Sequence, residues 1–184
     1  MGFPSVGNRL LLDFVATLGK RGTRNLERLG DPADLTRWGE HVGVGAVGDA
    51  DADALDAARE LREALYRLCE HALGRRHPQQ PDVDVVNAWA SLPPPPAALT
   101  IVNGQLVRQD PAPTTAGLLA AVARDAVDLF IGGDVERLRE CEGETCTLLF
   151  VDVSRDGRRR WCSMDSCGAQ AKMRALRSRR RAEP

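Results

Sequence analysis

Four of the five cysteines lie between residues 141 and 167, and their spacing is regular. Four residues separate Cys141 from Cys146, four separate Cys162 from Cys167, and fifteen separate the two pairs. Structural zinc takes four ligands in a tetrahedron at about 2.3 Å, which two short-gap cysteine pairs can supply. A full set of thiolates leaves no open position for a water molecule, so a catalytic zinc is disfavoured. The spacing therefore predicts one structural zinc ion per chain.

Other interpretations of the cysteines remain open. They could be reduced residues of an apolar core, and iron–sulfur ligation is a weaker alternative because the spacing matches no ferredoxin pattern. The N-terminal segment has no basic region, Asp13 interrupts its apolar run, and no window approaches the roughly 20 apolar residues that span a membrane. We therefore expect a cytoplasmic protein with no membrane partner, in which disulfides are rare.

The residues around the cysteines predict a small zinc-binding module. Two β-prone runs, at residues 147–153 and 158–162, flank the turn signal Asp156-Gly157 and predict a hairpin. Ser163 can cap a following helix that holds Cys167 in or near its first turn. A knuckle, a hairpin and a helix that carries the last ligand form a treble-clef-like finger.

Basic residues are concentrated in the same region. Residues 155–184 contain ten arginines and lysines against three acidic residues, whereas residues 1–154 contain 15 basic and 23 acidic residues. A basic segment on an acidic body favours a polyanionic partner, although a terminal arginine run can also be a solvated tail. On the expected helix, Met173 and Leu176 would face the core of the finger, and basic side chains would reach phosphates and guanine edges. The nucleic-acid-binding candidates are Arg158, Arg159, Arg160, Lys172, Arg174, Arg177 and Arg180.

The remaining chain predicts a helical body. Apolar residues at helical spacing, with capping and stop signals, predict helices near residues 10–18, 32–43, 51–74, 82–92 and 115–131. Asn103-Gly104 lies between two β-prone runs and predicts a hairpin. The predicted fold is mainly α (α+β), with a helical N-terminal domain at residues 1–137 that includes this hairpin. A treble-clef-like zinc finger, a β-hairpin plus a helix, follows at residues 138–184.

Two segments resemble known families. Residues 146–181, CTLLFVDVSRDGRRRWCSMDSCGAQAKMRALRSRRR, resemble the CGNR zinc finger, and GNRLLLDFVATL at residues 7–18 resembles the start of the ABATE domain that precedes this finger in bacteria. The resemblance implies a stress-associated transcription regulator with a ligand-sensing or dimerising body and a DNA-binding finger. It places the zinc ligands at the four cysteines and a basic-aromatic run at residues 158–161. Ala169 and Gln170 stand where the finger family has Asn and Arg.

The N-terminal resemblance also suggests a ligand pocket. Asp13 and Thr17 fit the family pattern and are the candidate pocket residues, while Ala16 stands where the family usually has Asn. A buried, hydrogen-bonded structural role for Asp13 is the alternative.

Two functions remain open on the sequence. The first is a zinc-containing regulator that binds DNA through the finger, with a small-molecule effector as a further partner. The alternative is a zinc-stapled protein-interaction or ligand-binding adaptor without direct DNA binding. An enzyme is not predicted, because the three histidines are isolated, no glycine-rich phosphate loop is present and Cys69 fits a buried helix position. A homodimer is expected, since bacterial DNA-binding proteins commonly match paired half-sites with two-fold symmetry.

Overall fold

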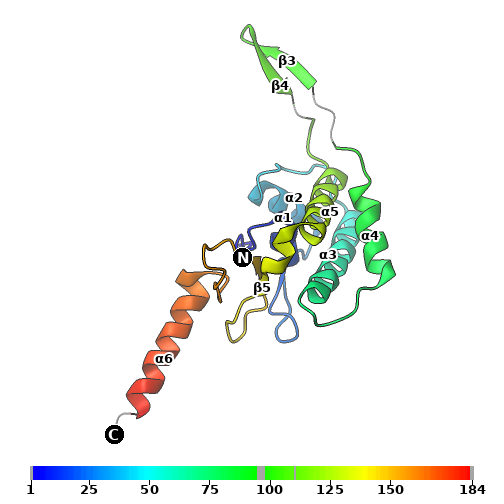
Figure 1. The fold of residues 1–184 in the computed structure, drawn as a ribbon. Coiled ribbons are helices and arrows are strands. Elements are labelled where there is room, and N and C mark those ends of the chain that lie inside the picture. Colours follow the sequence, from blue (N-terminus) through cyan, green and yellow to red (C-terminus); the bar gives the residue numbers. More distant parts are fainter. Residues whose placement is uncertain (1, 95–97, 110, 183–184) are drawn as a thin grey trace.

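The computed structural model describes residues 2–94, 98–109 and 111–182, with side chains described as far as Arg179. The body contains five helices, which are α1 (Leu10–Val15), α2 (Pro32–His41), α3 (Ala52–Ala72), α4 (Gln80–Ala90) and α5 (Thr115–Ile131). Helices α3, α4 and α5 lie side by side, and α1 packs against α3 and α5 (Figure 1). Within the described residues, no helix is long and apolar enough to cross a membrane.

Local signals set the helix boundaries, as the sequence predicted. Helix α2 begins after Asp31, whose carboxylate accepts the N–H of Asp34 while the Asp34 carboxylate accepts the N–H of Asp31. The carboxylate of Asp51 accepts the N–H of Ala54 at the start of α3. Such caps satisfy amides that have no partner inside the helix and stabilise it by about 1 kcal/mol each.

The core of the body lies between these helices. Phe14 of α1 and Trp38 of α2 are fully buried, with ring centroids 4.8 Å apart. Leucines of α3 and α5 complete the same cluster. A two-residue ribbon, β1 (Leu18–Gly19) with β2 (Leu26–Glu27), closes the segment between α1 and α2.

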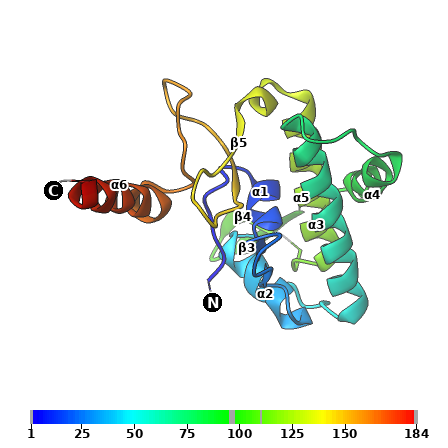
Figure 2. The same ribbon diagram turned by 90° about the horizontal axis from the view of Figure 1, so that it is seen from below.

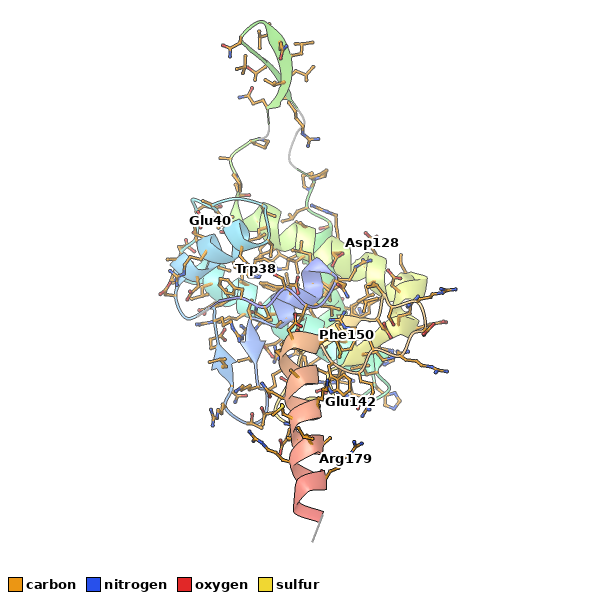
Figure 3. All side chains as sticks on the ribbon, turned by 90° about the vertical axis from the view of Figure 1, so that its left-hand side faces the viewer. Trp38, Glu40, Asp128, Glu142, Phe150 and Arg179 are labelled. Atoms are coloured by element: carbon orange, nitrogen blue, oxygen red, sulfur yellow. The ribbon has the colours of Figure 1, made fainter. Side chains whose placement is uncertain are left out.

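The predicted hairpin at Asn103-Gly104 is confirmed. Strands β3 (Ala98–Val102) and β4 (Gln105–Gln109) are antiparallel. Asn103 and Gly104 both have positive φ, 51° and 77°, which is the conformation that two-residue hairpin turns of type I′ require. The ribbon stands away from the helices (Figures 1 and 3).

The C-terminal region also contains a hairpin and a helix, but the hairpin differs from the prediction. After the short 3-10 turn η1 (Gly133–Arg137), strand β5 (Leu138–Glu140) pairs with β6 (Leu149–Val151), so that the first cysteine pair lies in the loop between them. Residues 158–161 form no strand. The predicted pairing within residues 147–162 is therefore wrong.

The buried carboxylate of Asp152 explains the difference. It accepts the N–H of Ser154 at 2.9 Å and the N–H of Arg159 at 2.8 Å, which curls the chain into a loop directly after β6. Amides that bond to a side chain in this way are not available for a strand ladder. The chain then enters a π-helical turn, η2 (Met164–Gly168), and helix α6 (Ala169–Ala182), which extends away from the rest of the molecule (Figure 2).

Candidate metal centre and basic helix

Three structural elements bring the four cysteines together. Cys141 directly follows β5, and Cys146 lies in the loop that leads to β6. Cys162 follows the loop that Asp152 organises, and Cys167 lies in the turn η2, where the helical segment begins. Cys141 and Cys162 are buried, and the other two cysteines are partly exposed.

The distances between the sulfurs fit a tetrahedral zinc site. All four Sγ atoms lie within 4.8 Å of one another, with 3.8 Å between Cys146 and Cys162 and 3.7 Å between Cys162 and Cys167. Four sulfurs at about 2.3 Å from a zinc ion are separated by about 3.8 Å along each edge of the tetrahedron. The predicted ligand set therefore fits one structural zinc ion.

The four thiols lie close enough to shift one another's pKa values. The hydrogen bond from Cys162 lowers the pKa of Cys146 to about 5, and the same contact raises the pKa of Cys162. Burial raises the pKa of Cys167 to about 11. Zinc binds cysteine as the thiolate, so its binding to these four cysteines releases protons and depends on pH.

The backbone near the sulfurs complements the thiolate charge. The N–H groups of Gly143 and Cys162 point at the Sγ of Cys141, at 3.4 and 3.2 Å. Gly143 is also a steric requirement, because a Cβ at this position would lie 2.9 Å from the Cβ of Cys146 and 3.0 Å from the Sγ of Cys167. Reasoning from the sequence missed Gly143, although a glycine inside a cysteine knuckle was a usable signal.

A small core lies beside the metal centre. Phe150 of β6 is fully buried, and Val6 and Trp161 pack around it (Figure 3). The guanidinium of Arg159 lies 4.5 Å from the centre of the Phe150 ring and donates to the carbonyls of Trp161, at 2.9 Å, and Cys162. Arg159 was predicted to contact nucleic acid, but here its donors bind the backbone that carries a zinc ligand.

The N-terminal segment joins the body to the finger. The N–H of Val151 donates to the carbonyl of Gly7 at 2.9 Å, and the Asn8 side chain donates to the carbonyl of Val151 at 2.9 Å. Asp13 holds this segment, because its Oδ1 accepts the N–H groups of Val6 and Gly7 at 3.0 and 2.9 Å. Burial raises the pKa of Asp13. These contacts agree with the alternative role for Asp13, that of a buried, hydrogen-bonded structural residue.

Thr17 is engaged in a buried polar network. It is fully buried, donates to the carbonyl of Phe14 at 2.7 Å and accepts from Arg62 at 3.2 Å. Arg62 is 3% exposed and pairs with both carboxylate oxygens of Glu27, at 2.6 and 2.7 Å. A buried guanidinium needs such partners to offset its lost hydration. The ligand-pocket role of Asp13 and Thr17 stays a prediction that these internal contacts do not favour.

The basic candidates occupy two kinds of position. On α6, the basic residues Lys172, Arg174, Arg177 and Arg179 are exposed, and Arg174 pairs with Glu144 at 3.0 Å. On the loop before Cys162, Arg158 is exposed, while Arg160 pairs with Glu142 at 2.5 Å and lies over the ring of Trp161. The side chain of Arg180 lies outside the described residues.

The prediction that Met173 and Leu176 face the core of the finger is wrong. Met173 and Leu176 are 48% and 42% exposed, because α6 extends beyond the finger instead of crossing it (Figures 1 and 2). Val6, from the opposite end of the chain, occupies the finger core in their place.

Two grooves were not predicted. An apolar groove of about 520 Å³ lies between α3, α4 and α5, lined mainly by Leu68, Val83, Val86, Val127 and Phe130. A more polar groove of about 670 Å³ follows η2 and α6, lined by residues that include Asp165, Gln170, Met173, Arg174 and Arg177.

A helical body joined to a four-cysteine finger defines a zinc-binding protein of regulator-like architecture, and comparison with known families agrees. Residues 8–133 match the ABATE family, described as "Putative stress-induced transcription regulator", and residues 137–180 match the CGNR zinc finger. The first match covers more than half of the chain, so the chain belongs to the ABATE family and carries a CGNR zinc finger at its C-terminal side. The resemblance found in the sequence is confirmed. A comparison with curated proteins finds no match.

Proposed function

We propose that this protein is a transcription regulator that binds double-stranded DNA through its zinc finger and α6. The observation that carries the proposal is the position of α6, which begins at the zinc-bound turn and projects into solvent with exposed basic side chains (Figure 2). The helix has no acidic residue between positions 169 and 182. Its 14 residues span about 21 Å, and the major groove of DNA admits a helix.

The residues of α6 divide into two DNA-facing roles. Gln170, Arg174 and Arg177 follow one another at helical spacing and line the same groove. Arginine pairs with guanine and glutamine with adenine in the major groove, so we assign base contacts to this face. Lys172 and Arg179 lie seven residues apart on another face, and we assign them to phosphates. Gln170, which replaces the family arginine, retains a side chain that can read a base.

The acidic neighbours refine this assignment. Arg160 and Arg174 pair with Glu142 and Glu144, and such exposed ion pairs contribute little to stability. DNA phosphates can therefore displace these glutamates at low cost. Arg159 supports DNA binding indirectly, by holding the backbone at Cys162.

A salt titration tests the proposal. We expect the zinc-loaded protein to bind a fluorescent duplex in a salt-dependent way, measured by fluorescence anisotropy. The double variant Lys172→Ala/Arg179→Ala should reduce the slope of log K against log salt by up to about 1.8, because each lost phosphate contact contributes about 0.9. Arg24→Ala/Arg76→Ala removes two exposed charges from the body and should leave the slope unchanged.

Two results would contradict DNA binding through α6. The first is an equal loss of slope in both double variants, which would indicate a delocalised charge effect. The second is the absence of binding at low salt by protein that holds one zinc ion per chain, which would favour the adaptor function.

We further infer that the body senses a small apolar molecule in the groove between α3, α4 and α5. Ligand pockets commonly measure about 300 to 1,000 Å³ and are mostly apolar, as this groove of about 520 Å³ is. Val135 of η1 lines the groove, six residues before the first zinc ligand, so an occupant would contact the segment that leads into the finger.

The fluorescent probe anilinonaphthalene sulfonate tests this groove. We expect Val83→Glu, which introduces into the groove a charge of the same sign as the sulfonate of the probe, to reduce probe binding by at least about tenfold, a change of about 1.4 kcal/mol. Val44→Glu places the same charge at an exposed site that is not among the groove residues. Equal probe binding by the two variants would contradict the assignment.

A further inference from the structure

The ribbon formed by β3 and β4 exposes more apolar surface than an isolated hairpin can sustain. Five large apolar side chains are exposed, with Leu99 at 70%, Ile101 at 69%, Val102 at 50%, Leu106 at 71% and Val107 at 38%. A two-stranded ribbon is at best marginally stable alone in water, and an exposed apolar patch of several hundred Å² marks an interaction surface. The ribbon therefore needs a covering partner.

The register places three of these side chains, Leu99, Ile101 and Leu106, on one face of the ribbon. Residues paired across two antiparallel strands project to the same side of the ribbon, and consecutive pairs alternate. The pairs Ile101 with Leu106 and Leu99 with Arg108 thus share one face. The opposite face is mixed, because it carries Thr100, Gln105 and Gln109 beside two valines. The first face is the apolar one.

We propose that this ribbon is a dimerisation arm, and that its apolar face packs against the same face of a second copy of this chain. Between residues 98 and 109, Arg108 is the only residue that carries a charge, so two copies meet without repulsion between several like charges. The ribbon also has none of the lysines or prolines that commonly protect exposed strand edges from pairing. A partner that binds through charged residues would find only one, Arg108, between residues 98 and 109.

The available area supports a reversible dimer. The three apolar side chains of this face, Leu99, Ile101 and Leu106, expose roughly 400 Å² per chain, so two arms can bury roughly 800 Å². This area lies below the range of about 1,200 to 2,000 Å² for stable interfaces, so we expect a weak dimer. Figure 1 places the ribbon and α6 at opposite ends of the molecule. A dimer formed through the arms therefore leaves both basic helices exposed, and the proposal does not depend on DNA binding.

Sedimentation velocity of the full zinc-loaded chain, from about 1 to about 100 μM, tests the proposal. We expect the wild type to pass from one-chain to two-chain species over this range. Ile101→Lys/Leu106→Lys places two charges on the apolar face and should weaken association at least about 30-fold, through loss of apolar burial. Gln105→Lys/Gln109→Lys adds the same charges to the mixed face of the same ribbon and should change association less than about threefold.

Three outcomes would overturn the proposal. The wild type could remain a single chain at about 100 μM, or the two lysine variants could weaken association equally. The third outcome is a dimer that Val83→Glu also disrupts, because it would place the arm in the apolar groove of the partner. The four substituted side chains in the arm are exposed, so the variants should keep one zinc ion per chain and the wild-type circular dichroism spectrum.

Discussion

Replacing Arg159 by alanine separates the structural and DNA-contacting roles of the basic run before Cys162. Arg158 and Arg159 are adjacent and carry the same charge, but only Arg159 lies over the Phe150 ring and donates to the carbonyls of Trp161 and Cys162. Arg158→Ala is therefore a matched control that removes the same charge from an exposed position.

The contacts of Arg159 set the size of the expected effect. A hydrogen bond from a charged group contributes about 1.5 to 3 kcal/mol, and a cation–π contact about 0.5 to 1 kcal/mol at partly exposed sites. Because Arg159 is only partly buried, we take the lower values for two hydrogen bonds and one ring contact, and expect a loss of about 3.5 kcal/mol. Arg158→Ala should cost less than about 0.5 kcal/mol.

Zinc affinity converts this energy into a measurable ratio. Zinc binding and folding of a finger are coupled, so a loss of about 3.5 kcal/mol in the folded finger weakens zinc affinity about 300-fold. Competition with a chromophoric chelator measures the ratio directly. Arg159→Lys keeps the charge but loses the planar fork, and should fall between alanine and the wild type.

Two results would refute this reasoning about Arg159. Equal zinc affinities for Arg158→Ala and Arg159→Ala would show that the inward contacts contribute little. A variant Arg159→Ala that keeps its zinc affinity and loses DNA binding would instead place the side chain on DNA.

The remaining predictions concern Gly143, Asp13 and the metal. Gly143→Ala should weaken zinc affinity at least about tenfold, because the new methyl group meets the Cys167 sulfur. Gly133→Ala is the control, since its methyl group meets nothing within 4 Å and should leave zinc affinity unchanged. Competition with a chelator compares the two variants. Burial raises the pKa of Asp13 above 3.8 in the folded state, so its contribution to stability falls as pH rises through that folded pKa. Asp13→Asn keeps an acceptor oxygen, so urea titrations of this variant should show a weaker dependence of stability on pH. Asp13→Ala should lower the free energy of unfolding by about 1 to 3 kcal/mol. A wild-type stability that does not change with pH in this range would contradict the assignment. Zinc removal by a chelator should disorder the finger and leave the body helices folded, seen as a partial loss of helical circular dichroism, whereas complete unfolding would show that the body depends on the metal.

Local chemistry explains which parts of the fold were predictable. Asp31 and Asp51 cap the helices that follow them, and Asn103-Gly104 forms the turn between the two strands that flank it. Each signal acts over a few residues and needs no distant partner. The cysteine spacing was informative for a similar reason, since the requirements of one zinc ion restrict which residues can surround it.

Features that depend on distant partners were not predictable. The β-prone run at residues 158–162 pairs with no strand, because Asp152 captures the N–H of Arg159 and β5 supplies the partner of β6. Met173 has the helical spacing of a core residue, yet Val6 takes the place expected for it. The sequence could not show the inward contacts of Arg159, since exposed and inward arginines look alike in a sequence, and its contact with nucleic acid stays a prediction.

The position of the N-terminal segment changes how the two family regions relate to one another. Val6 lies in the finger core and the carbonyl of Gly7 bonds to β6, while Asp13 of α1 holds the N–H groups of both residues. Helix α1 is in turn fixed to α5, because the carboxylate of Asp125 accepts the N–H of Leu11 at 2.9 Å. Since α5 also lines the apolar groove, a continuous set of contacts runs from that groove to the residues beside the zinc ligands. The finger is therefore built from both ends of the chain, and its stability depends on where the body holds α1.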